Sequence, residues 1–146
     1  MIKVLLSVFF LIPIFLLGQD TTSTKSISDD DKEYNVIDGS TKTLTKLDHP
    51  PEYSEGFKGM QKIIAKTMRY PPKAQDAGIS GIVEVVFIVD STGTAINHKV
   101  QRGIGYGCDE EALNAVKQIR GKWIPGVLNG KKVNVEYILP VMFQLR

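Results

Sequence analysis

Apolar residues recur at helical spacing in a stretch that begins near residue 56. The positions that share one face are Phe57, Met60, Ile64 and Met68. This spacing predicts an amphipathic helix over residues 56–69. The helix should end at Tyr70, because a residue before proline is pushed out of the α region. Pro72 can then open a short second helix over residues 73–77, which Gly78 closes.

Three later stretches alternate with the period of a β-strand. Residues 81–90 are largely apolar on both faces, which predicts a central strand. Residues 95–102 follow the turn Ser91-Thr92-Gly93 and should pair with residues 81–90 as a hairpin. A third strand is predicted over residues 132–145, after the turn signal Asn129-Gly130.

A second main helix lies between these strands. Its first turn is acidic, at residues 109–111, and its far end is basic, which suits the helix dipole. The buried stripe is predicted at Ala112, Ala115, Val116 and Ile119. Residues 50–146 are therefore expected to form one α+β domain, a three-stranded antiparallel sheet with two main helices on one face.

The first 49 residues have a different character. Residues 4–17 are apolar apart from Ser7 and Pro13, and they follow a single positive charge. This run is shorter than the roughly 17–20 residues that a membrane helix needs, so residues 1–18 are predicted to be a signal peptide, cut after Gly18. An uncleaved inner-membrane anchor is the alternative. Residues 19–49 are polar and without a clear period, and they are predicted to be a flexible linker.

Composition argues against several classes of function. The formal net charge is +2, from 18 basic and 16 acidic residues, so there is no strong basic excess that favours nucleic acid. The single cysteine, Cys108, and two separated histidines suggest neither a disulfide framework nor a zinc cluster. The glycine-rich residues 103–107 lack the third glycine of a dinucleotide-binding loop. We predict no catalytic set, no metal site and no cofactor.

An ordered set of short motifs runs through residues 50–146. They are Tyr70-Pro71, Ala74, Gly78-Ile79-Ser80-Gly81, Val83-Glu84-Val85-Val86-Phe87-Ile88-Val89-Asp90, Gly93, Asp109-Glu110-Glu111-Ala112, Trp123-Ile124-Pro125-Gly126, Gly130-Lys131-Lys132-Val133 and Leu139-Pro140-Val141. In this combination the chain resembles the C-terminal domain of TonB, the energy transducer of Gram-negative bacteria. It is most similar to the compact stand-alone domains common in Bacteroidetes.

The resemblance implies a periplasmic, non-enzymatic domain that supports energy-dependent transmembrane transport. In the family, the final strand pairs with a short segment, the TonB box, of outer-membrane transporters. Two family features are missing here. Residues 1–18 contain no histidine to match the one that couples TonB to the ExbB–ExbD motor, and no proline-rich spacer precedes Pro50. These departures count against coupling to ExbB–ExbD but leave the binding fold intact.

The last strand is the main candidate for partner binding. An edge strand presents unpaired backbone groups, which a partner segment can match by strand addition. The residues predicted to bind are Val133, Asn134, Val135, Glu136, Tyr137, Ile138, Leu139 and Val141. The expected partners are outer-membrane TonB-dependent transporters or other envelope proteins. A structural homodimer or envelope scaffold that pairs the same edge is the alternative.

Two further motifs have predicted roles. Tyr70 and Pro71 resemble the family position near the bound segment, and a simple helix stop is the alternative reading. Trp123, Pro125 and Gly126 are predicted to be structural, because a buried indole anchors a core and Pro-Gly redirects the chain into the last strand.

Overall fold

The computed structural model describes residues 32–145. In chain order the elements are β1 (Glu33–Asp38), β2 (Thr41–Lys46), β3 (Glu52–Tyr53), α1 (Gly56–Thr67), α2 (Pro72–Asp76), β4 (Gly81–Val89), β5 (Ala95–Arg102), α3 (Cys108–Lys117), β6 (Trp123–Ile124), β7 (Gly126–Leu128) and β8 (Lys131–Phe143). The two main helices, the short helix and the three long strands all lie within a few residues of where the sequence pattern puts them.

The main sheet has six strands, so the prediction of three is wrong. Its order is β2-β1-β8-β4-β5, with β7 also paired to β8, and all these pairs are antiparallel. A separate two-stranded sheet joins β3 to β6. The α+β class itself is confirmed. The missed strands of the main sheet are a three-residue strand, β7, and the polar hairpin β1–β2, neither of which carries a strong hydrophobic period.

The pair β4–β8 forms the centre of the sheet. Nine residue pairs join the two strands without a break, from Gly81↔Phe143 to Val89↔Val135. Val85, Phe87 and Leu139 are almost fully buried on the face that the helices cover. As predicted, β4 is central, because β8 and β5 flank it.

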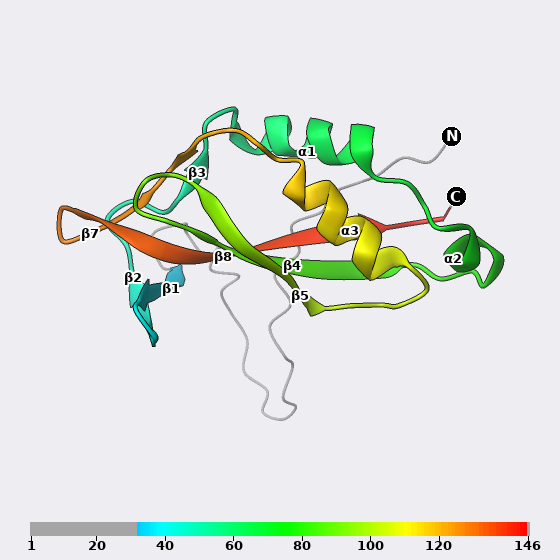
Figure 1. Ribbon diagram of the computed structural model, residues 1–146, viewed down its shortest axis with the longest axis horizontal. Helices are drawn as coiled ribbons and strands as arrows, with labels where there is room; N and C mark the ends of the chain where they lie inside the picture. Colours follow the sequence, from blue (N-terminus) through cyan, green and yellow to red (C-terminus); the bar gives the residue numbers. More distant parts are fainter. Residues whose placement is uncertain (1–31, 146) are drawn as a thin grey trace, which may run out of the picture.

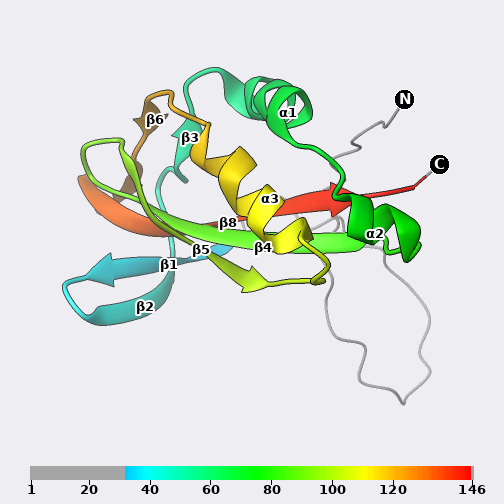
Figure 2. The same ribbon diagram turned by 45° about the vertical axis from the view of Figure 1, so that its right-hand side comes forward.

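The two main helices lie on the same face of the sheet (Figure 1). From α1, Met60 and Ile64 are buried, and α3 contributes Ala112 and Val116 to the same core. Figure 2 shows α3 crossing in front of β4 and β5, which it contacts, while α1 lies beside α3. The opposite face of the sheet carries neither of these helices.

The polar segment before residue 50 is partly folded, so a flexible linker over all of residues 19–49 is wrong. Residues 33–46 form the hairpin β1–β2, with six residue pairs and the two-residue loop Gly39-Ser40. Gly39 has a φ of +57°, which a glycine adopts at little cost. A Gly-Ser loop between two short runs is a hairpin signal that the sparse apolar residues obscured.

The predicted signal peptide, residues 1–18, lies outside the described residues, as does the first part of the predicted linker. Within residues 32–145, no helix is long and apolar enough to cross a membrane.

Candidate protein-interaction edge

Strand β8 has β4 along one edge, and its other edge is only partly occupied. On that second edge β1 pairs at three positions, Asn35↔Glu136, Val36↔Val135 and Ile37↔Asn134. Beyond Glu136, the second edge pairs with no other strand within the described part of the chain. The unpaired stretch therefore runs from Tyr137 toward Phe143.

The turn before β8 shows which backbone groups of β8 point toward β7 and which point away from it. Asn129 and Gly130 have φ values of 51° and 73°, as in a two-residue type I′ turn. The residues flanking such a turn, Leu128 and Lys131, exchange backbone hydrogen bonds. Since the bonding direction alternates along a strand, the odd-numbered residues of β8 direct their backbone groups toward β7. In agreement, the N–H of Val127 donates away from β8, to the carbonyl of His49 at 2.8 Å.

Pro140 gives the same direction independently. It pairs with Glu84 inside the unbroken β4–β8 register, although it has no N–H to donate. A proline keeps the ladder intact only where its nitrogen faces away from the neighbouring strand. The even-numbered residues of β8 therefore direct their backbone groups away from β4, toward the edge that β1 shares.

The free groups on this edge belong to three residues. Asn134 and Glu136 face β1, so Ile138, Pro140 and Met142 remain. Ile138 and Met142 each offer an N–H and a C=O, and Pro140 offers a C=O. We call these three residues the open row. The side chain of Ile138 is 43% exposed, and Met142 and Pro140 are partly exposed.

Much of the predicted binding stretch is thus already used inside the chain. Val133 pairs with Gly126 of β7, and the next three residues pair with β1. Val135, Leu139 and Val141 are at most 1% exposed, so their side chains belong to the core. Tyr137 is partly buried beside Phe87 and Trp123. Of the eight predicted residues, only Ile138 lies in the open row. Sequence pattern alone missed Pro140 and Met142, although the lack of an N–H in Pro140 was a usable signal.

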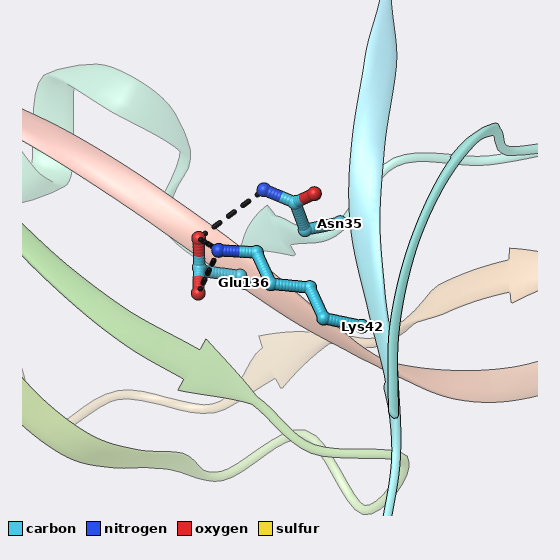
Figure 3. Close-up of polar contacts among 3 residues, drawn as sticks. All are labelled: Asn35, Lys42 and Glu136. Atoms are coloured by element: carbon cyan, nitrogen blue, oxygen red, sulfur yellow. Dashed lines mark hydrogen bonds and ion pairs between the residues drawn. The ribbon is translucent and has the colours of Figure 1, made fainter. Parts of the chain in front are cut away.

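A polar cluster fixes the hairpin to β8 (Figure 3). The Lys42 Nζ lies 2.7 and 3.0 Å from the two carboxylate oxygens of Glu136, and Asn35 Nδ2 donates to Glu136 Oε1 at 3.2 Å. The Glu136 side chain is 13% exposed and that of Lys42 is 51% exposed. The cluster therefore lies where the pairing with β1 ends and the open row begins.

Tyr70 and Pro71 lie beside the far end of β8. The Tyr70 hydroxyl donates to the carbonyl of Ile79, and its ring packs edge-on against Phe143 with centroids 5.5 Å apart. Tyr70 is 7% exposed, and Pro71 is the residue before α2. This geometry supports a structural role for Tyr70.

Trp123, Pro125 and Gly126 lie where the chain enters the last hairpin. The Trp123 ring is 4% exposed and packs among Tyr53, Phe87 and Tyr137 at centroid distances of 5.0–5.4 Å. A Cβ on Gly126 would lie 2.6 Å from the Val135 side chain, so the glycine allows β7 to approach β8 closely. These contacts favour the structural reading.

The glycine-rich loop before α3 is held by the protein itself. Asp109 Oδ1 accepts hydrogen bonds from the N–H groups of Ile104 and Gly105, at 2.8 and 3.1 Å. Those donors are not available to a phosphate. Burial raises the pKa of the Cys108 thiol, and the carboxylates of Asp109 and Glu110 raise it further, which disfavours the reactive thiolate.

His98 is the partly buried histidine of β5. Its ring stacks on Phe87 with centroids 5.0 Å apart, and burial lowers its pKa, with Lys117 acting in the same direction. Within residues 32–145, no three His, Cys, Asp or Glu side chains gather where they could hold a metal ion.

Comparison with known proteins adds a similar solved structure and a family. The chain is similar to the NMR solution structure of the TonB C-terminal domain of Helicobacter pylori, with 26% identity over 60% of this chain and 78% of that chain and a TM-score of 0.46. No curated protein matches. The family model described as the C-terminal of the Gram-negative bacterial TonB protein matches residues 66–145, more than half of the chain. The protein therefore belongs to the TonB C-terminal domain family.

Proposed function

We propose that this protein binds short extended segments of outer-membrane transporters, or of other envelope proteins, by strand addition to β8. Binding of this kind would support energy-dependent transmembrane transport. The family is one of protein-interaction domains rather than enzymes, and its members lie in the periplasm of Gram-negative bacteria. The observation that carries the proposal is the open row, Ile138, Pro140 and Met142, on a strand whose other edge pairs with β4 from Val135 to Phe143.

The open row offers limited binding energy. Its five backbone groups would contribute on the order of 5 kcal/mol before the ordering cost of the guest, since each hydrogen bond is worth about 0.5–1.5 kcal/mol. A guest that pairs here alone binds weakly. Apolar guest side chains that contact Ile138 and Met142 would add to the affinity and supply selectivity.

A peptide titration followed by NMR tests the proposal. The probes are eight-residue peptides that cover the TonB boxes of transporters encoded in the same genome. We expect amide shifts that include residues 137–143, with Ile138 and Met142 among the largest, because their N–H groups would gain acceptors. Shifts confined to β5, the opposite edge of the main sheet, would overturn the assignment of this edge.

We also propose that residues 1–18 direct export and are removed after Gly18. The motivating pattern is the short apolar run after Lys3. Mass spectrometry of the mature protein should find Gln19 as its first residue. An intact Met1 would favour the inner-membrane anchor, and direct coupling to an energy-transducing motor would then be the next question.

A homodimer through the same edge is the second candidate. Two open rows related by a two-fold axis would place Ile138 opposite Met142, where backbone hydrogen bonds can form, and Pro140 opposite Pro140, where neither residue can donate. Sedimentation velocity over a hundredfold concentration range separates the two functions. A concentration-dependent dimer that does not bind the peptides would support the scaffold function.

A further inference from the structure

We propose that the β1–β2 hairpin is a replaceable internal strand, which a guest segment displaces from β8 when it binds. The docked guest would then pair from Asn134 to Met142 instead of along the open row alone. This inference rests on the proposed function, and it specifies how much of β8 the guest uses and what kind of segment fits.

The hairpin is attached to β8 over a short distance. Three residue pairs join β1 to β8, against nine between β4 and β8. Within β2, every residue except Thr45 is exposed, and Leu44 is 59% exposed. No residue of the hairpin belongs to the buried core. Because a two-stranded hairpin is at best marginally stable alone, its order depends on this short attachment.

Strand β1 of the hairpin occupies backbone groups of β8 that a longer guest needs. Asn134 and Glu136 have the same backbone direction as Ile138, Pro140 and Met142, so the five residues form one continuous row of donors and acceptors. While β1 is in place, a guest reaches three of the five positions. Displacement of β1 replaces its backbone bonds with equivalent bonds to the guest and lengthens the ladder. The hairpin also lies before the region that the family model matches, residues 66–145.

The contacts that β1 makes describe the guest that can replace it. Val36 lies opposite Val135, so the guest should carry an apolar, β-branched residue there. Asn35 and Lys42 both reach the Glu136 carboxylate, so the guest should place a basic or amide side chain beside it. The fitting segment is an extended chain of about nine residues with one such polar position next to alternating apolar ones.

A reversible lock tests the displacement. Val36→Cys with Val135→Cys would place two thiols at directly opposed positions of an antiparallel pair, within disulfide range. Cys108 is buried and should not compete. Using the peptides of the NMR titration on the full chain, we expect the oxidised protein to bind at least tenfold more weakly than its own reduced form. The reduced form is the matched control, because it carries the same two substitutions without the covalent bond between β1 and β8.

The outcomes separate the two proposals. Equal affinity of the oxidised and reduced forms, with shifts at residues 137–143 in both, would overturn the displacement but leave the proposed function standing. Absence of binding by every form, including the wild type, would overturn both.

A second variant covers the case in which the double cysteine protein fails to fold. Lys42→Ala removes the ion pair between the hairpin and Glu136 and leaves the Asn35 hydrogen bond as the remaining side-chain contact to that carboxylate. We expect severalfold tighter peptide binding and faster amide exchange at Asn35 and Ile37, whereas Lys58→Ala, on the exposed surface of α1, should change neither. Faster exchange in the hairpin without any gain in affinity would contradict the proposal.

Discussion

Pro140 shows how one residue type determines which way a strand can bind. Because its nitrogen carries no hydrogen, an unbroken ladder with β4 requires that it face the other edge, and the backbone groups of Ile138 and Met142 must follow. The backbone groups of Leu139, which lies between Ile138 and Pro140, point the other way, toward β4.

This alternation predicts different results for two neighbouring proline substitutions. Ile138→Pro should leave the protein folded and weaken peptide binding by about fivefold, since it removes one outward donor worth about 1 kcal/mol. Leu139→Pro should lower the free energy of unfolding by about 3 kcal/mol or more, because it breaks the inner ladder and removes a buried side chain. Urea denaturation and peptide titration of both variants measure the two effects. The same loss of stability in both would show that the assigned backbone directions are wrong.

His98 predicts the pH dependence of stability. Burial against Phe87 and the nearby Lys117 lower its folded-state pKa below the ordinary 6.5. A lowered pKa means that the unfolded chain binds more protons as the pH falls, so the free energy of unfolding should decrease below about pH 6.5. His98→Gln should flatten this part of the curve. Urea unfolding at half-unit steps from pH 7.5 to 5 measures the two slopes, and parallel slopes would exclude His98 as their source.

At the scale of elements, the quality of the hydrophobic period decided what the sequence could predict. Strands β4 and β5 were predicted almost residue for residue, because β4 is apolar on both faces and a turn follows it. The hairpin β1–β2 was missed because its burial comes from contact with β8 and not from an apolar face of its own. The missed pairing of β1 also affected the candidate site. The sequence identified the right strand, but it did not show which backbone groups of that strand pair with another strand.

The packing of β7 on β8 gives a prediction at this scale. Gly126→Ala would place a Cβ 2.6 Å from Val135 Cγ2, so the free energy of unfolding should fall by about 1–3 kcal/mol. Val135→Ala removes the opposing methyl groups, and the double variant should therefore lose less than the sum of the two single losses. Thermal unfolding of the four proteins completes the cycle. Simple additivity would mean that the two positions do not contact each other in this way.

At the scale of the whole molecule, the fold consists of a family domain and an added hairpin. The family model begins at residue 66, inside α1, whereas the described residues already form the hairpin β1–β2 and β3 before it. The core is built from β3 onward, because its first buried hydrophobic residue is Tyr53. The hairpin therefore widens the sheet without contributing to the core, and its effect falls on the edge of β8 that a partner would use.

A chain that begins at Leu47 tests this division of the molecule. Leu47 is kept because its side chain would be 3.3 Å from a Cβ at Gly126, at the junction with β7. Relative to a chain that begins at Lys32, we expect cooperative unfolding to persist, with a thermal midpoint lower by about 4–8 °C for each kcal/mol that the hairpin contributes. The shorter chain exposes the full row from Asn134 to Met142, so it should also self-associate more readily, as unpaired edges do. Loss of cooperative unfolding would instead make the hairpin an integral part of the domain, and a guest could not then replace it without unfolding its host.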